Sequence, residues 1–199
     1  MTEDSNEKKE KLQFEGIIRG NKVLVNSEEA IKEFYEGSYI GTLEQNSNAQ
    51  RVLLLDPLEV LLLSERRRII LRKNNKKTEE GLEFEELISY FSQYDDNVWQ
   101  KYIIYMDLRK RGYIVRKGYG EGVDFLVYPR GANFQDDTAR YLIFPVFEGT
   151  PVELRDLDKM SRVAMSSRKD LIIATVDRLS KPIYYSVNKF QIMNKEEQK

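Results

Sequence analysis

The sequence of 199 residues contains neither cysteine nor histidine. Without cysteine, the chain can form neither a disulfide framework nor a thiolate metal site. Without histidine, it lacks the side chain that titrates near neutral pH, which excludes Ser-His-Asp and Cys-His triads, histidine-ligated zinc and acid–base catalysis by histidine. Apolar residues make up 41% of the sequence and charged residues 33%, which is the composition of a globular protein with a heavily charged surface. The length suits one domain or two small ones.

Charge is distributed unevenly between the two halves of the chain. Residues 97–199 contain 18 Lys and Arg against 13 Asp and Glu, and residues 1–96 contain 14 against 20. A net charge of +5 in the second half indicates an anionic partner for that half, although two solvated surfaces could differ in this way by chance. No apolar run approaches the roughly 20 residues of a membrane span, and the polar N-terminus is no signal peptide, so a cytoplasmic location is expected.

Turn and capping residues in the first half predict a mixture of strands and helices. Gly20-Asn21 lies between apolar pairs and predicts a β-hairpin over residues 14–25. Ser27 suits the cap of a helix over residues 28–36, and Pro57 suits the first turn of a helix over residues 56–64. The remaining expected elements are a strand at residues 69–71, a basic loop at 73–77 and an acidic amphipathic helix over 78–92.

The second half predicts a sheet flanked by helices. Asn97 suits the cap of a long helix that ends in a basic turn followed by Gly112. Thr150 and Glu153 have the spacing of a capping box and predict a helix that ends near Lys169. Strands are expected at residues 113–116, 123–128, 141–147, 171–176 and 183–187. The expected organisation is a polar tail at 1–12, an N-terminal domain at 13–93, a C-terminal domain at 97–190 and a polar tail at 191–199.

A set of motifs in the second half resembles the catalytic domain of the tRNA-splicing endonuclease family. The matching residues are 107–113 (DLRKRGY), Gly118, 124–131 (DFLVYPRG), 141–143 (YLI), 161–164 (SRVA), 167–169 (SRK), Ala174 and 184–185 (YY). The first half resembles the small leading domain of that family, most clearly at residues 56–60 (DPLEV). The resemblance implies an α+β fold: a small mixed N-terminal α/β domain, then a nuclease-like domain with a mixed β-sheet flanked by helices.

The resemblance also implies an active site of tyrosine, histidine and lysine that cleaves RNA without a metal or cofactor. In the family, the tyrosine is assigned the role of base, the histidine that of acid and the lysine that of a cation beside the phosphate. Tyr128 and Lys169 fall on the tyrosine and lysine positions, whereas Thr138 stands where the histidine belongs. A threonine hydroxyl is far too weak an acid to replace imidazolium near neutral pH. Without the resemblance, Tyr128 would be a packing residue of a strand and Lys169 a cation at a helix end.

Arginines and a glycine-rich segment are further candidates for contact with RNA. Arg162 matches a family arginine that stacks on a bulged RNA base, and Arg130 lies in the tyrosine motif, so both are expected to bind RNA. In isolation, Arg162 would belong to a solvated helix face. Residues 118–122 (GYGEG) join two expected strands and open no helix, which predicts a hairpin turn rather than a phosphate-binding loop.

Two functions from different classes are compatible with these residues. The first is a structural, catalytically incompetent subunit of a heterotetrameric tRNA-splicing endonuclease, with precursor tRNA and a histidine-bearing catalytic paralogue as partners. The second is a self-sufficient, metal-independent RNA endonuclease that uses Tyr128 and Lys169 with an acid other than histidine. A generic RNA-binding protein on the same scaffold is a third. If the family's pairing holds, the terminal strand carries the interface through Tyr184, Tyr185 and Val187, together with Asp177 in the preceding loop.

Overall fold

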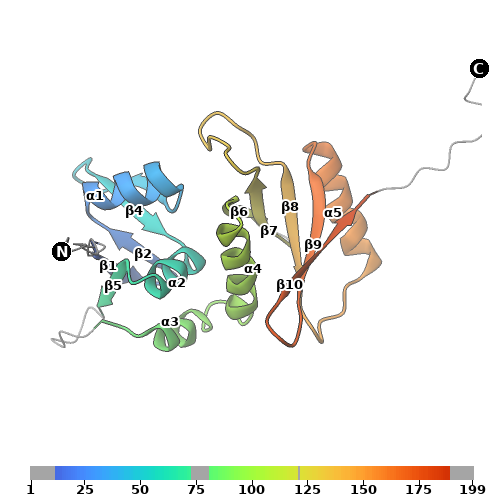
Figure 1. The fold of residues 1–199 in the computed structure, drawn as a ribbon, viewed down its shortest axis with the longest axis horizontal. Helices are drawn as coiled ribbons and strands as arrows, with labels where there is room; N and C mark the ends of the chain where they lie inside the picture. Colours follow the sequence, from blue (N-terminus) through green and yellow to red (C-terminus); the bar gives the residue numbers. More distant parts are fainter. Residues whose placement is uncertain (1–11, 73–80, 121, 189–199) are drawn as a thin grey trace, which may run out of the picture. The chain divides into compact units, whose positions relative to one another are not determined.

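The computed structural model describes residues 12–72, 81–120 and 122–188. The chain divides between Tyr102 and Ile103 into two compact units, Met1–Tyr102 and Ile103–Lys199. Each unit contains a five-stranded sheet within its described residues (Figure 1). The predicted α+β class is therefore confirmed. Within the described residues, no helix is both long and apolar enough to cross a membrane.

The first sheet has the strand order β3-β4-β2-β1-β5. All neighbours are antiparallel except β1 and β5, which are parallel. Its strands are β1 (Phe14–Arg19), β2 (Lys22–Val25), β3 (Thr42–Gln45), β4 (Arg51–Leu55) and β5 (Ile69–Arg72). The predicted hairpin is confirmed, because β1 and β2 pair around Gly20, whose φ of 60° suits glycine in a tight turn.

The helices of the first unit are α1 (Glu28–Ala30), the π-helix η1 (Ile31–Glu36), α2 (Pro57–Glu65) and α3 (Phe84–Phe91). Ser27 caps α1 as expected, since its side chain accepts a 3.2 Å hydrogen bond from the Ala30 backbone N–H. The helix that follows is nevertheless mostly π rather than α. The α2 helix begins at Pro57, and its capping box joins Asp56 and Glu59. Glu59 is the buried charged residue of this core and also accepts a 2.8 Å hydrogen bond from the Gly41 backbone N–H.

Three expectations for the first unit were wrong or lie outside the described residues. Strands β3 and β4 are not among the predicted elements, since the prediction begins at the break before Pro57 and assigns no strand to the apolar residues that precede it. The helix expected over residues 78–92 begins only at Phe84, since the Leu82 backbone N–H donates to the Leu71 carbonyl and residues 81–83 are not helical. The basic loop expected at residues 73–77 lies outside the described residues.

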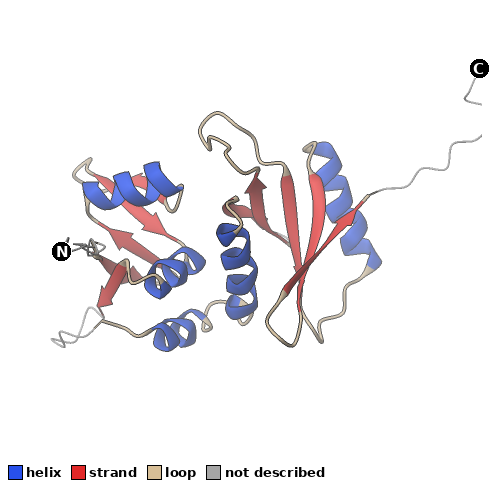
Figure 2. Ribbon diagram, in the orientation of Figure 1, coloured by secondary structure: helices blue, strands red, loops and turns tan. Residues whose placement is uncertain are grey.

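The second sheet has the strand order β10-β9-β8-β7-β6, and β8 and β9 are its parallel pair. Its strands are β6 (Ile114–Gly120), β7 (Val123–Tyr128), β8 (Tyr141–Val146), β9 (Asp170–Val176) and β10 (Pro182–Val187). The helix α5 (Leu154–Ser166) connects β8 with β9 and covers one face of the sheet (Figure 2). A core of Val123, Leu142, Met160, Ala164 and Leu171 lies between them.

The other face of the second sheet carries the C-terminal part of α4 (Val98–Lys110). Tyr105 of this helix contacts Phe125 of β7, with ring centroids 6.4 Å apart. The helix ends as predicted: Gly112 has φ of 86°, and the backbone N–H of Tyr113 donates to the Leu108 carbonyl. At its start α4 begins at Val98, directly after Asn97 as predicted, and the backbone N–H of Lys101 donates to the Asn97 carbonyl. The Asp95 carboxylate accepts the backbone N–H of Asn97 just before the helix.

The helix expected to open at the Thr150 capping box begins at Leu154 instead. Its N-terminal cap is Glu153, and the Thr150 backbone N–H closes a turn on the Phe147 carbonyl. The glycine-rich hairpin was predicted correctly, since β6 and β7 are antiparallel neighbours. A Cβ at Gly118 would lie 2.1 Å from the Val123 carbonyl oxygen, so this close approach of two strands requires glycine.

Candidate functional site

Three chain segments meet at one end of the second sheet. β7 ends at Tyr128, the loop of residues 129–140 leads into β8, and the turn after α5 leads into β9 (Figure 1). The backbone N–H of Arg140 donates to the Val127 carbonyl, and the backbone N–H of Asp170 donates to the Arg140 carbonyl, both at 2.9 Å. Tyr128 and Lys169 therefore stand on either side of the segment that contains Thr138.

Lys169 is positioned by the C-terminal turn of α5. The backbone N–H of Lys169 donates to the Ala164 carbonyl at 2.9 Å, and that of Arg168 donates to the Met165 carbonyl at 3.1 Å. Such a turn needs a left-handed residue, a place that usually belongs to glycine, and here Arg168 adopts it with φ of 53°. The ammonium group of Lys169 donates to the Ser167 carbonyl at 3.2 Å, and Lys169 as a whole is half-buried.

Tyr128 is held by an aromatic contact from the loop that follows it. The ring of Phe134 meets the Tyr128 ring edge to face, with centroids 5.6 Å apart. The guanidinium of Arg116 on β6 lies 4.6 Å from the Phe134 centroid, a cation–π distance. This stack fixes the half-buried Tyr128 side chain at the end of its strand.

Thr138 lies in the irregular stretch just before β8, and it is exposed. The loop around it is braced by its own side chains: the Asp137 carboxylate accepts the Asn133 backbone N–H at 2.7 Å, and Asp136 accepts from the Asn133 amide at 2.5 Å. The fold thus brings a phenol, an ammonium group and a threonine hydroxyl to one end of a sheet. Such an end can offer a base and a cation to a phosphate, but Thr138 offers it no acid that works near neutral pH.

Comparisons with known proteins identify the family to which both halves of the chain belong. Residues 98–185 match the family described as tRNA intron endonuclease, catalytic C-terminal domain, and residues 14–88 match its N-terminal domain. The chain belongs to the tRNA intron endonuclease family. The tRNA-splicing endonuclease of Methanococcus maripaludis is 35% identical over 170 residues, which cover 85% of this chain and 90% of that protein. The tRNA-splicing endonuclease of Thermococcus onnurineus is 32% identical over 179 residues, which cover 90% of this chain and 96% of that protein.

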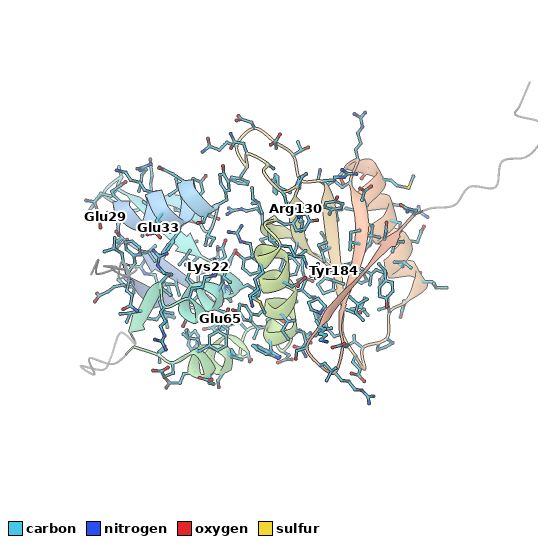
Figure 3. The ribbon with its side chains drawn as sticks, viewed as in Figure 1. Lys22, Glu29, Glu33, Glu65, Arg130 and Tyr184 are labelled. Atoms are coloured by element: carbon cyan, nitrogen blue, oxygen red, sulfur yellow. The ribbon has the colours of Figure 1, made fainter. Side chains whose placement is uncertain are left out.

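The two arginines expected to bind RNA lie on different elements of the family's C-terminal domain. Arg162 is on the outer face of α5 and forms an ion pair with Asp158 at 2.6 Å, so its guanidinium is exposed but already paired. Arg130 follows β7 and lies over the Tyr113 ring, 5.7 Å from its centroid (Figure 3). That these side chains contact RNA stays a prediction.

Three of the residues expected at the interface lie on β10, an edge strand of the second sheet within the described residues, and Asp177 lies in the turn before it. Tyr185 is 54% exposed, whereas Val187 packs against the core beneath α5. Tyr184 points to the other face, where its hydroxyl donates to Asp107. The Asp177 carboxylate accepts the backbone N–H groups of Leu179 and Lys181 at 2.9 and 2.8 Å, so it closes its own loop.

Sequence reasoning did not single out Phe134 and Arg116, which hold Tyr128, or Asp107, which holds Tyr184. Phe134 could have been found from the sequence, because it is an aromatic residue in the polar loop that follows the tyrosine motif. Asp107 lies in the matching motif at residues 107–113, but no local pattern indicates its contact with Tyr184 or that of Arg116 with Phe134, because both contacts join separate elements of the fold.

Proposed function

We propose that this chain is a structural subunit of a tRNA-splicing endonuclease, supporting assembly and RNA binding while a histidine-bearing paralogue provides the working active site. The observation that carries the proposal is the histidine position of the family: Thr138 stands there, in a sequence without a single histidine. Family membership and the names of the relatives support precursor tRNA as the substrate of the assembled enzyme.

The chemistry explains why one missing side chain is decisive. In the family's reaction, the 2′-hydroxyl loses its proton and attacks the adjacent phosphorus, and the bond from phosphorus to the 5′ oxygen of the next nucleotide breaks. The products are a 2′,3′-cyclic phosphate and a 5′-hydroxyl, so the departing oxygen must receive a proton. Positioned acid–base catalysis of this kind contributes roughly 10²- to 10⁴-fold in rate. Thr138 cannot supply that proton near neutral pH.

One observation favours a second candidate, a self-sufficient endonuclease. Tyr128 and Lys169 flank the same segment, and Lys169 is placed by a turn that keeps Arg168 in a left-handed conformation. Strained backbone tends to persist at functional sites. In this alternative, Tyr128 removes the 2′ proton, Lys169 stabilises the phosphate and water protonates the leaving oxygen.

A mixing experiment separates the two candidates. The chain and its histidine-bearing paralogue are purified separately, and cleavage of an intron-containing tRNA precursor is followed for each and for the mixture. The structural-subunit proposal predicts negligible cleavage by this chain alone and robust cleavage by the mixture. Turnover by rigorously purified chain without the paralogue would overturn it in favour of the second candidate.

The assembled complex provides the matched control. Tyr128→Phe and Lys169→Ala in this chain should leave the turnover of the complex within about twofold, because the paralogue supplies the reacting groups. The corresponding substitutions in the paralogue should abolish turnover. A loss of about a hundredfold or more from the changes in this chain, with assembly intact, would show that it contributes catalytic groups.

A further inference from the structure

An open cavity of about 270 Å³ lies in the second unit between the C-terminal end of α4 and the sheet. Its polar walls are Arg111 and three tyrosines, Tyr113, Tyr141 and Tyr184, and its apolar lining includes Val127 and Ile143. Side chains alternate between the two faces of a strand, so Val127 points into this cavity and Tyr128 to the opposite face. The cavity is therefore separate from the family's active-site position.

The tyrosines of the cavity present aromatic surface in defined orientations. The rings of Tyr113 and Tyr141 are nearly perpendicular, at 86°, with centroids 6.4 Å apart. Tyr184, labelled in Figure 3, is fixed by its 2.8 Å hydrogen bond to Asp107. A planar group entering the cavity thus meets ring faces and edges that are already held in place, which lowers the entropy lost on binding.

Cations accompany these rings. The guanidinium of Arg130 lies 5.7 Å from the Tyr113 centroid, and that of Arg140 lies 5.4 Å from the Tyr141 centroid. The side chains of Arg140 and Arg111 are 63% and 57% exposed. Two carboxylates are near: Asp170 pairs with Arg140, and Asp107 pairs with Arg111. Three arginines against two carboxylates leave this region positive.

We propose that this cavity binds one unpaired nucleobase of an RNA strand, with Arg130 and Arg140 contacting the flanking phosphates. The proposal rests on the proposed function, since it assigns a place for an unpaired nucleotide of the precursor RNA. Stacking on aromatic rings beside exposed cations is how proteins hold single-stranded RNA, because every base has a π-face. The positive charge and the open, partly polar walls favour a nucleotide over an apolar side chain of a partner protein.

The test compares two RNAs on the full-length chain. Fluorescence anisotropy measures the affinity for a labelled single-stranded RNA of eight nucleotides and for an abasic ribose-phosphate strand of equal length. The wild-type chain should prefer the RNA with bases by about tenfold, the size expected for one base–aromatic stack. Tyr141→Ala should remove most of this preference, and Tyr141→Phe should restore it because the ring remains.

Matched controls address charge and folding. Arg140→Gln should weaken the binding of both strands alike and reduce the dependence of binding on salt. Arg178 is an exposed arginine that pairs with Glu148, and Arg178→Gln should change neither the affinity for the two strands nor its dependence on salt. Tyr94→Ala removes an exposed tyrosine of the first unit and should keep the preference. Circular dichroism confirms that each variant is folded.

Two outcomes would overturn the proposal. One is a wild-type chain that binds both strands equally. The other is a folded Tyr141→Ala variant that keeps the preference for bases but no longer sediments with the paralogue, which would assign the cavity to a protein contact. Cleavage by the mixture is measured in parallel and decides the structural-subunit proposal independently, because base preference is read from binding alone.

Discussion

The hydroxyl of Tyr184 on β10 donates a 2.8 Å hydrogen bond to Oδ2 of Asp107 on α4, across 77 positions of sequence. The same carboxylate oxygen accepts a 2.8 Å hydrogen bond from Nε of Arg111. Asp107 thus ties the edge strand of the second sheet to the helix that covers one face of that sheet. Among the described residues, β10 has a strand neighbour on one side alone, so this bond is one of the restraints on its position.

Removing the Tyr184 hydroxyl should therefore destabilise the protein. Tyr184→Phe keeps the ring and deletes the hydrogen bond, so we expect the free energy of unfolding to fall by about 1–2 kcal/mol. Urea unfolding at pH 7 measures the change. Tyr185→Phe is the matched control, since its ring is exposed on the opposite face of the same strand, and it should change stability by less than about 0.5 kcal/mol. Equal effects would show that the bond to Asp107 contributes nothing specific.

The same contact predicts a dependence on high pH. Burial, and then the hydrogen bond to Asp107, raise the pKa of Tyr184 above its ordinary value. The folded state therefore holds this proton where the unfolded state begins to release it, near pH 10. The stabilisation is complete below that pH and is lost as pH rises above it. The difference in unfolding free energy between wild type and Tyr184→Phe should shrink between pH 9 and about pH 11. A difference in unfolding free energy that stays constant over this pH range would contradict the raised pKa of Tyr184.

Local patterns predicted the fold wherever turn chemistry was explicit, as at Gly20 and Gly112, where glycine adopts positive φ. They failed where two elements share one apolar run. Leu53 and Leu55 belong to β4 and Val60 to α2, and the break at Asp56 was recognised without its preceding strand. Thr150 has the spacing of a capping box, but Glu153 is the N-terminal cap of α5, because spacing alone does not determine at which residue a helix begins.

Sequence resemblance predicts that Tyr128, Thr138 and Lys169 fall on the family's catalytic positions, and pairing in the sheet brings their segments together. The resemblance could not predict the contacts and the backbone conformation that hold these residues in position. Phe134 contacts Tyr128 because of the conformation of the loop that follows β7. The left-handed conformation of Arg168 could not be predicted from the sequence, because arginine rarely adopts it.

Arg168 is the basis of a further prediction. A non-glycine residue in the left-handed region costs about 1–2 kcal/mol, part of which glycine recovers. Arg168→Gly should accordingly raise the free energy of unfolding by roughly 0.5–1 kcal/mol. Arg168→Ala keeps Cβ and should give no such increase. If urea unfolding shows the same change for both variants, the side chain rather than the backbone conformation determines the effect.

Restoring the missing acid tests the site itself. Thr138→His places an imidazole in the segment between Tyr128 and Lys169, and we expect weak cleavage of a tRNA precursor by this chain, at least about tenfold above the wild-type background. The double variant Thr138→His, Lys169→Ala should return to background if the new activity uses this site. No gain from Thr138→His alone would mean that the segment holds position 138 too far from the other two groups, since catalysis tolerates about an ångström of misplacement.

The last prediction ranks two contributions to assembly. Ile183 and Tyr185 are exposed on edge strand β10, at 41% and 54%, whereas the Asp177 carboxylate is already used within its own turn. Apolar groups on an unpaired edge gain from coverage by a partner, so Tyr185→Asp should separate the subunits by placing a charge in the contact. Asp177→Asn keeps the oxygen that accepts from Leu179 and Lys181, so the turn should survive and association should weaken only slightly, more so at low salt than at high salt. Sedimentation of each variant with the paralogue measures the order. Intact complexes of Tyr185→Asp beside dissociated Asp177→Asn would reverse it, and would mean that charge on the loop, rather than the apolar strand, holds the subunits together.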